Sequence, residues 1–269
     1  DPIFESGTFS KNQIYATDWN TAVFTETYSA PPVVIMGPLS SNNTQPATVR
    51  VRNVTATGFE WQIDEFEYED GYHGTEQVSY FVMEEGVHDV GGLIFEVGRT
   101  NVSSGNTTVS LDSSHTVAPA VFPQVESDNN TVVANDTIAL IPRVRYVDAG
   151  EFLIQLQDQE LNTGSFPAES VGYIAITPGQ GTLRSRPFEA TVTGILYNHK
   201  LKTINFGPIS GAEVFVSQQT RKGGDPAHFR YNQMTDSSVG IYLEEEQSKN
   251  SEQRHNKEAA GVFVIGQPF

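Results

Sequence analysis

The sequence contains no cysteine, and this absence removes several kinds of site at once. A chain without cysteine has no disulfide framework, no thiol nucleophile and no zinc site built on thiolates. It also has no apolar run close to the roughly 20 residues that a membrane-spanning helix requires, so we do not expect membrane insertion.

Positive charge is also scarce, because 16 Lys and Arg stand against 33 Asp and Glu, which gives a formal net charge of −17. Phosphate contacts need clustered basic side chains, so nucleic acid is not an expected partner. The excess negative charge of the protein also repels anionic membrane surfaces and sulfated polymers, so neither is an expected partner. The length of 269 residues allows one large domain or two to three small ones, and 16 Phe and 10 Tyr can supply packed cores.

Some features bear on the compartment of the protein. The chain opens at Asp1-Pro2 without Met or a signal peptide, as expected of a mature product or of a piece excised from something longer. Asn-x-Ser/Thr sequons, which are acceptors in a eukaryotic secretory pathway but also arise by chance in a chain rich in Asn and Thr, lie at Asn42, Asn53, Asn101, Asn106, Asn129 and Asn135. We expect a secreted or cell-surface location.

Internal repetition is the strongest signal in the sequence. The string Phe4-Glu5-Ser6-Gly7 returns as Phe95-Glu96-Val97-Gly98 and, degraded, as Phe188-Glu189-Ala190-Thr191. Runs that begin at a glutamate and continue with apolar residues recur at the same interval, at residues 76–83, 169–176 and 258–265. Two markers with one period of about 90 residues predict three units, at residues 1–92, 93–181 and 182–269, with boundaries near Gly91-Gly92 and Gln180-Gly181.

The pattern within each unit predicts β-strands. Residues 49–54 and 59–64 alternate apolar and polar side chains, which is typical of strands with one wet face. The final run of each unit is apolar on both sides, so it can cover its own core and also a neighbouring unit. We therefore expect an all-β fold of three tandem antiparallel β-sandwich units in a pseudo-threefold arrangement.

Segments of the first unit resemble a known family. Pro31-Pro32-Val33-Val34 and residues 51–59 and 78–82 resemble the H-type lectin domain, found in snail agglutinins and discoidins. The resemblance covers most of the first unit, is clear at the end of the second and is weaker in the third. Residues 67–76 are similar to tandem H-type-like repeats in large bacterial surface proteins and in appendages of polysaccharide-degrading enzymes.

The resemblance implies a six-stranded antiparallel sandwich in each unit. In these lectins, three chains form a trimer that binds galactose-type sugars, notably N-acetylgalactosamine, in pockets between neighbours. Because three units share one chain here, the resemblance implies a monomer that acts as an internal pseudo-trimer. The family's aromatic-plus-histidine pair falls near Phe66-Glu67, with His73 a few residues on, and Arg50 lies near its basic sugar contact.

The loop before the final strand of the first and third units is the predicted binding site. Sugar recognition uses flat apolar rings for C–H faces and planar polar groups for hydroxyl pairs. The candidate ligand-binding residues are Phe66, Tyr68, Asp70, Tyr72, His73, Arg254 and His255. The alternative is a solvated hairpin tip, where polar residues and glycine are expected anyway.

Comparison of the three copies separates scaffold positions from ligand-contact candidates. The glutamate at positions 76, 169 and 258 recurs, which favours a structural role. The residue three positions before it is His73, Phe166 or His255, and this variation favours a ligand contact. Trp61 aligns with isoleucine in the other copies and is expected in the core, whereas Trp19 is either an exposed stacking platform or a local cap.

The sequence thus predicts a non-catalytic carbohydrate-binding module, for galactose-type sugars or a galactan, within a larger secreted enzyme or adhesin. The alternative is a structural or adhesive spacer of a cell-surface protein, without a sugar site. No nucleophile elbow or phosphate loop occurs, so an enzyme is not expected. We expect no cofactor; Asp128-Asn129-Asn130 and Asp70-Gly71 could supply oxygens to a structural calcium ion, but neither has the EF-hand spacing.

Overall fold

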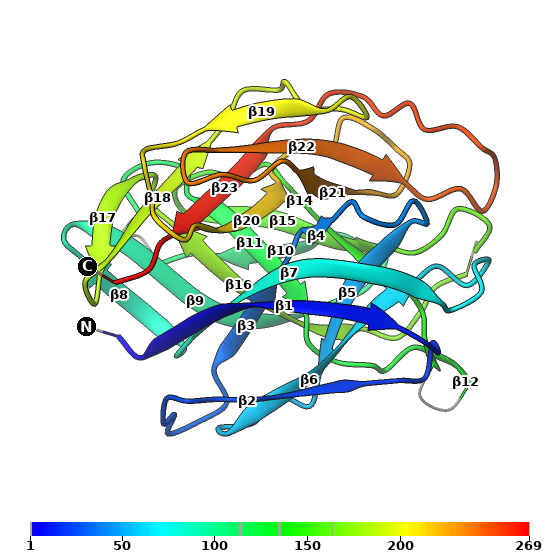
Figure 1. The fold of residues 1–269 in the computed structure, drawn as a ribbon, viewed down its shortest axis with the longest axis horizontal. Helices are drawn as coiled ribbons and strands as arrows, with labels where there is room; N and C mark the ends of the chain where they lie inside the picture. Colours follow the sequence, from blue (N-terminus) through cyan, green and yellow to red (C-terminus); the bar gives the residue numbers. More distant parts are fainter. Residues whose placement is uncertain (1, 113–114, 134–135, 163, 269) are drawn as a thin grey trace.

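The computed structural model describes residues 2–112, 115–133, 136–162 and 164–268 (Figure 1). The Asn135 sequon lies outside these residues. The described part of the chain forms strands, turns and irregular segments without a helix, and so it contains no helix that could cross a membrane. The all-β class predicted from the alternation of side chains is confirmed.

The first sandwich is built from two antiparallel sheets. One sheet has the order β1 (Phe4–Gln13), β7 (His73–Met83), β3 (Val33–Met36), and the other has the order β2 (Asn20–Val23), β6 (Gly58–Glu65), β5 (Ala47–Arg52). Side chains from both sheets share one core, in which Trp61 is 2% exposed and stacks on Phe9 with ring centroids 4.9 Å apart. The prediction that Trp61 is a core residue is confirmed.

The second sandwich repeats this plan with additions. Its sheets have the orders β11 (Ala120–Val125), β16 (Glu169–Ile176), β9 (Leu93–Val102), β8 (Gly86–Val90) and β10 (Thr107–Ser110), β15 (Glu151–Gln157), β14 (Ile141–Arg145). A short hairpin of β12 (Thr131–Val133) and β13 (Asp136–Thr137) stands outside both sheets. Gly91 and Gly92 form the β8–β9 turn with φ of 64° and 90°, a conformation that favours glycine.

The third sandwich includes a strand from the first part of the chain. Its sheets have the orders β17 (Gly179–Leu183), β18 (Arg186–Val192), β23 (Ala260–Ile265), β20 (Glu213–Gln218) and β19 (Lys202–Asn205), β22 (Ser238–Glu245), β21 (Ala227–Asn232), β4 (Leu39–Ser40). Strand β4 runs parallel to β21 and ties the first sandwich to the third. Strand β8 pairs with β9, and β17 pairs with β18. The predicted unit boundaries, near Gly91-Gly92 and Gln180-Gly181, therefore fall inside these two hairpins.

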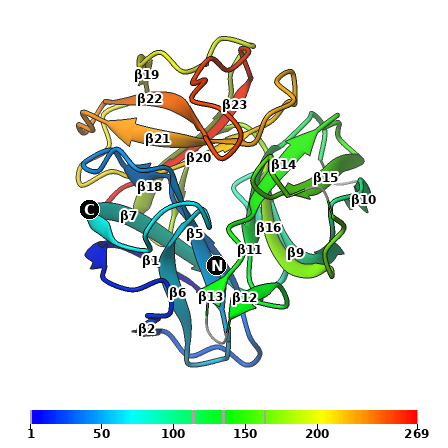
Figure 2. The ribbon, with the colours of Figure 1, turned by 90° about the vertical axis from the view of Figure 1, so that its right-hand side faces the viewer.

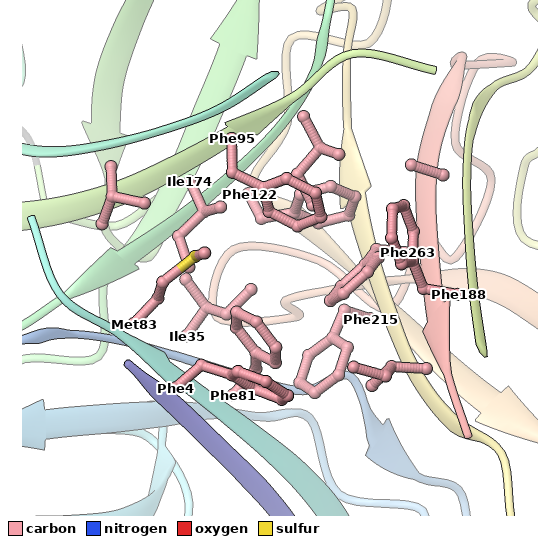
Figure 3. Close-up of a cluster of buried hydrophobic side chains, with 14 of the residues drawn as sticks. Phe4, Ile35, Phe81, Met83, Phe95, Phe122, Ile174, Phe188, Phe215 and Phe263 are labelled. Atoms are coloured by element: carbon pink, nitrogen blue, oxygen red, sulfur yellow. The ribbon is translucent and has the colours of Figure 1, made fainter. Parts of the chain in front are cut away.

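The three sandwiches form three lobes around a common centre (Figure 2). Phenylalanine side chains from all three meet there and form a central core, among them Phe81, Phe95 and Phe263 (Figure 3). Strand β23 shows how a strand that is apolar on both sides is used. Phe263 points into the central core, whereas its neighbours Val262 and Val264 pack in the core of the third sandwich. The expectation that the final runs are buried on both faces is confirmed.

Candidate functional site

A buried arginine–glutamate pair lies at each junction between two sandwiches. We name the junctions by these pairs: seam A holds Arg50 and Glu169, seam B holds Arg143 and Glu258, and seam C holds Arg230 and Glu76. The N–O distances are 2.9, 3.3 and 2.7 Å, and each side chain is at most 1% exposed. Each arginine belongs to one sandwich and each glutamate to the next, so the pairs close a ring.

The glutamate of each pair also binds the backbone of its own sandwich. Glu76 accepts hydrogen bonds from the amides of Asn42 (3.0 Å) and Asn43 (2.8 Å) and from the Ser40 hydroxyl. Burial alone would raise the pKa of Glu76, but these donors, together with His73 and Arg230, hold it below its usual value. A charged carboxylate is therefore the stable form at this position.

The other two glutamates have matching partners. Glu169 accepts from the amides of Asn129 and Asn130, both at 3.0 Å, and Glu258 accepts from those of Lys222 (2.7 Å) and Gly223 (2.8 Å). All three glutamates are 0% exposed. Their predicted structural role is confirmed, since each one fixes a loop and pairs with a neighbour's arginine.

The two candidate histidines are buried beside these glutamates. His73 lies with Nδ1 2.7 Å from Glu65 Oε1 and Nε2 3.3 Å from Glu76 Oε1, and it is 0% exposed. Burial would lower the pKa of His73, but the two carboxylates outweigh it and raise that pKa. His255 repeats the arrangement with Glu245 (2.5 Å) and Glu258 (3.3 Å).

These contacts differ from the expectation that the variable His/Phe/His position touches a ligand. Both ring nitrogens of His73 and of His255 are engaged by carboxylates, and the rings have no open face toward solvent. Instead, His73 and His255 hold in place the loops that lead into β7 and β23, the last strands of the first and third sandwiches. Phe66, another candidate, is 1% exposed and packs with Ala139 and Ile141.

The remaining candidates are accessible on the surface. Tyr68 is 37% exposed and Tyr72 is 51% exposed, while Asp70 and Arg254 are also exposed. The structure brings the first and third predicted loops together, because the Gln247 amide donates to the Tyr68 hydroxyl at 2.8 Å. The loops that follow β6 and β22 lie at the end of the molecule away from the N and C marks (Figure 1). We call this end the loop face; it comprises residues 66–72, 158–162 and 246–257.

Two grooves open at the seams on the loop face. The seam B groove, of about 380 Å³, is lined by residues 155–160 and Asn162 of the second sandwich and by Gly224 and Pro226 of the third. The seam C groove, of about 200 Å³, is lined by residues 242–245, Gln247 and Gln253 of the third sandwich and by Thr44 of the first. Gln247 and Gln253 place the predicted residues Tyr68 and Arg254 next to the seam C groove.

The tryptophan left open by the sequence lies under an arginine. The guanidinium carbon of Arg52 stands 3.9 Å from the centroid of the Trp19 ring. Arg52 is fixed in turn by Glu60 at 2.7 Å and by Asp128 at 2.6 Å. This arrangement fits a local cap, because a cation already occupies one face of the ring. Within the described residues, no group of three or more His, Asp or Glu could hold a metal ion.

The fold and the seams define an all-β module of three packed sandwiches with grooves between them. No protein-family model matches the chain, and no solved structure matches it. The chain is similar to part of halomucin from Haloquadratum walsbyi (strain DSM 16790 / HBSQ001), with 31% identity over 281 residues. The match covers 98% of this chain and 3% of halomucin, so the chain spans a small fraction of the length of that relative.

Proposed function

We propose that this protein is a non-catalytic carbohydrate-binding module of a larger extracellular or cell-surface protein. The observation that carries the proposal is the pair of corresponding grooves at seams B and C, both lined by planar amide and carboxylate side chains. Such groups bind the paired hydroxyls of a sugar ring. The exposed rings of Tyr68 and Tyr72 on the same face offer surfaces on which a sugar can stack.

The architecture suits repeated weak binding. A rigid body that presents more than one groove on one face gains affinity for a polymer through effective concentration. The central core and the buried ion pairs hold the grooves in fixed relative positions. The resemblance to H-type lectins supports galactose-type sugars or a galactan as the ligand class.

The similarity to halomucin supports the proposed location. A segment of the size of this chain occurs there as 3% of a much longer protein, which is consistent with a module within a large assembly. We propose a secreted or cell-surface location on this basis. The net charge of −17 disfavours anionic glycans as ligands.

A structural or adhesive spacer is the second candidate. The closed ring of Arg–Glu pairs favours it, because rigidity alone serves a spacer. Retention on an insoluble neutral galactan, with elution by free galactose or N-acetylgalactosamine, separates the two functions. Retention and competitive elution support the binding module. Passage without retention on galactan, together with no signal on an array of neutral and anionic glycans, supports the spacer.

A further inference from the structure

The three seams are built alike, which allows their differences to be compared position by position. In the strand registers, Arg50 pairs with Gln62, Arg143 with Gln155 and Arg230 with Tyr242. The chain segment that lines the seam B groove begins at Gln155 and runs to residue 160. The segment that lines the seam C groove begins at Tyr242 and runs to residue 247. The corresponding stretch at seam A is therefore residues 62–67.

We infer that, among the residues that the structure describes, the loop face offers two ligand grooves rather than three, because part of the second sandwich fills seam A at that face, and that the seam B groove receives a neutral, hydroxyl-bearing ligand. A separate cavity of about 550 Å³ opens between the first and second sandwiches outside the loop face, where Pro31, Glu85, Arg99 and Glu126 line it. The inference rests on the proposed carbohydrate-binding function and specifies which of its sites are usable.

The segment that fills seam A follows Asn130. In the first and third sandwiches, short loops lead from Asn43 to β5 and from Gly223 to β21, whereas the second sandwich inserts the β12–β13 hairpin before β14. Thr137 of this hairpin accepts a hydrogen bond from Arg50 Nη2 at 2.7 Å. Arg143 and Arg230 instead donate to carbonyls of the short loops, those of Asp225 (3.0 Å) and Gln45 (3.3 Å).

Contacts after the hairpin complete the closure of seam A. The Ala139 amide donates to Glu67 Oε1 at 2.9 Å across the seam. Phe66, Ala139 and Ile141 form a cluster whose members are 1%, 0% and 2% exposed. Burial raises the pKa of Glu67 to about 7, as expected where water has been removed from around a carboxyl group. A sugar would have to displace this packed cluster.

The lining of the seam B groove includes four side-chain amides, those of Gln155, Gln157, Gln159 and Asn162. Gln157 is fixed at both ends, since its Oε1 accepts from Arg143 Nη1 at 2.8 Å and its Nε2 donates to the Gly224 carbonyl at 2.9 Å. Seam C has Glu244 at this position, where it binds Arg230 at 2.7 Å and His228 at 3.0 Å. At this position seam B therefore carries a neutral amide where seam C carries a carboxylate paired with Arg230, while each groove is lined by two acidic residues in all.

Gln159 provides an anchor for the ligand in seam B. Its side chain lines the groove and is 8% exposed, and its Oε1 has no hydrogen-bond partner among the residues that the structure describes. An unsatisfied buried acceptor costs free energy, and a donor from a bound molecule recovers it when the Gln159 side chain turns its oxygen toward the groove. A hydroxyl is such a donor, while a carboxylate would also meet Asp158 and Glu160 on the same groove. The site therefore favours neutral sugars.

The test is a calorimetric titration of the full chain with galactose, N-acetylgalactosamine and a neutral galactan oligosaccharide, with an oligogalacturonate as the anionic comparator. We expect two sites for a neutral probe and at least tenfold weaker binding to the anionic one. Gln159→Met should remove one of the two sites. Phe66→Met, at the same position of seam A, is the matched control and should leave both sites intact.

A second measurement covers the case in which Gln159→Met fails to fold. In the unmodified protein, the side-chain amide NMR signal of Gln159 should shift on addition of the neutral probe. Three equivalent sites, loss of binding in Phe66→Met alone, or an unmoved Gln159 signal during saturable binding would overturn the inference and leave the proposed function standing. No binding to any probe would overturn the proposed function itself.

Discussion

Arg230 and Glu76 are 154 residues apart in the chain, yet their side chains form an ion pair of 2.7 Å with no exposure to solvent. The pair joins the third sandwich to the first. The corresponding pairs Arg50–Glu169 and Arg143–Glu258 join the remaining neighbours. Separation of any two sandwiches would leave a charge without its partner, so the ring favours unfolding of the whole body in one step.

Arg230→Met should strongly destabilise the protein. Removal of one partner of a buried pair leaves the other charge uncompensated, at a cost of about 3–5 kcal/mol. Urea unfolding monitored by fluorescence measures this change. Arg184→Met is the control, because the Arg184–Glu26 pair is 36% and 40% exposed and such pairs contribute about 0–1 kcal/mol. Similar stabilities of the two variants would show that the ring does not hold the sandwiches together.

His73→Ala and Tyr72→Ala should have opposite consequences for stability and binding. His73 is buried between two carboxylates, so its removal leaves them facing each other without the imidazole that bridges them, and we expect a loss of about 2–4 kcal/mol. Tyr72 is 51% exposed, and its truncation should cost under about 0.5 kcal/mol while weakening retention on the polysaccharide. Differential scanning calorimetry separates the two. A stable His73→Ala variant would contradict the positioning role.

Glu67→Gln should stabilise the protein above neutral pH. The folded-state pKa of Glu67 is raised to about 7 by burial, so the stability linked to its protonation is complete below about pH 4.5 and is lost as the pH rises through 7. Glutamine keeps the acceptor for the Ala139 amide and does not ionise. The melting temperature at pH 8 should rise by a few degrees relative to the unmodified protein, with little change at pH 4.5.

Part of the dependence of the melting temperature on pH will remain in Glu67→Gln, because burial also raises the pKa of Glu126 to about 7. If the melting temperatures at pH 4.5 and pH 8 differ by as much in Glu67→Gln as in the unmodified protein, Glu67 is not the titrating group.

The melting temperature should rise with salt. A net charge of −17 destabilises a compact state through repulsion between surface carboxylates. Salt screens this repulsion, since the Debye length falls from about 30 Å at 0.01 M to about 3 Å at 1 M. The buried Arg–Glu pairs are screened much less. A melting temperature that falls over this range would show that favourable surface pairs dominate the repulsion.

The sequence alone predicted the features that recur locally. Alternating residues predicted the strands, and the recurrence of Glu76, Glu169 and Glu258 predicted their structural role. The partners of these glutamates were missed. Arg50, Arg143 and Arg230 occur at similar distances before the recurring glutamate, with two extra residues in the third copy, and this spacing was an available signal. Its meaning depends on contacts over more than 100 residues, because each arginine binds the next unit's glutamate.

The candidate site was predicted only in part, because it too depends on contacts between segments far apart in the chain. A local pattern of aromatic and polar residues identifies a loop but does not distinguish the exposed Tyr72 from the buried neighbour His73. The grooves at seams B and C are formed by segments far apart in the chain, such as Gln157 and Gly224. The closure of seam A depends on the β12–β13 insertion and on the hydrogen bond from Ala139 to Glu67 that follows it, and this long-range contact has no signature in the sequence.

The most direct test of carbohydrate binding at the seams is an NMR titration of the full chain with a neutral galactan oligosaccharide. We predict saturable shifts on the loop face, around Tyr68, Gln159 and Gln247, and no shifts around Gly91 and Arg186 at the other end of the molecule. Shifts confined to that other end, or no shifts with any neutral glycan, would contradict the claim that the seams of this module bind carbohydrate.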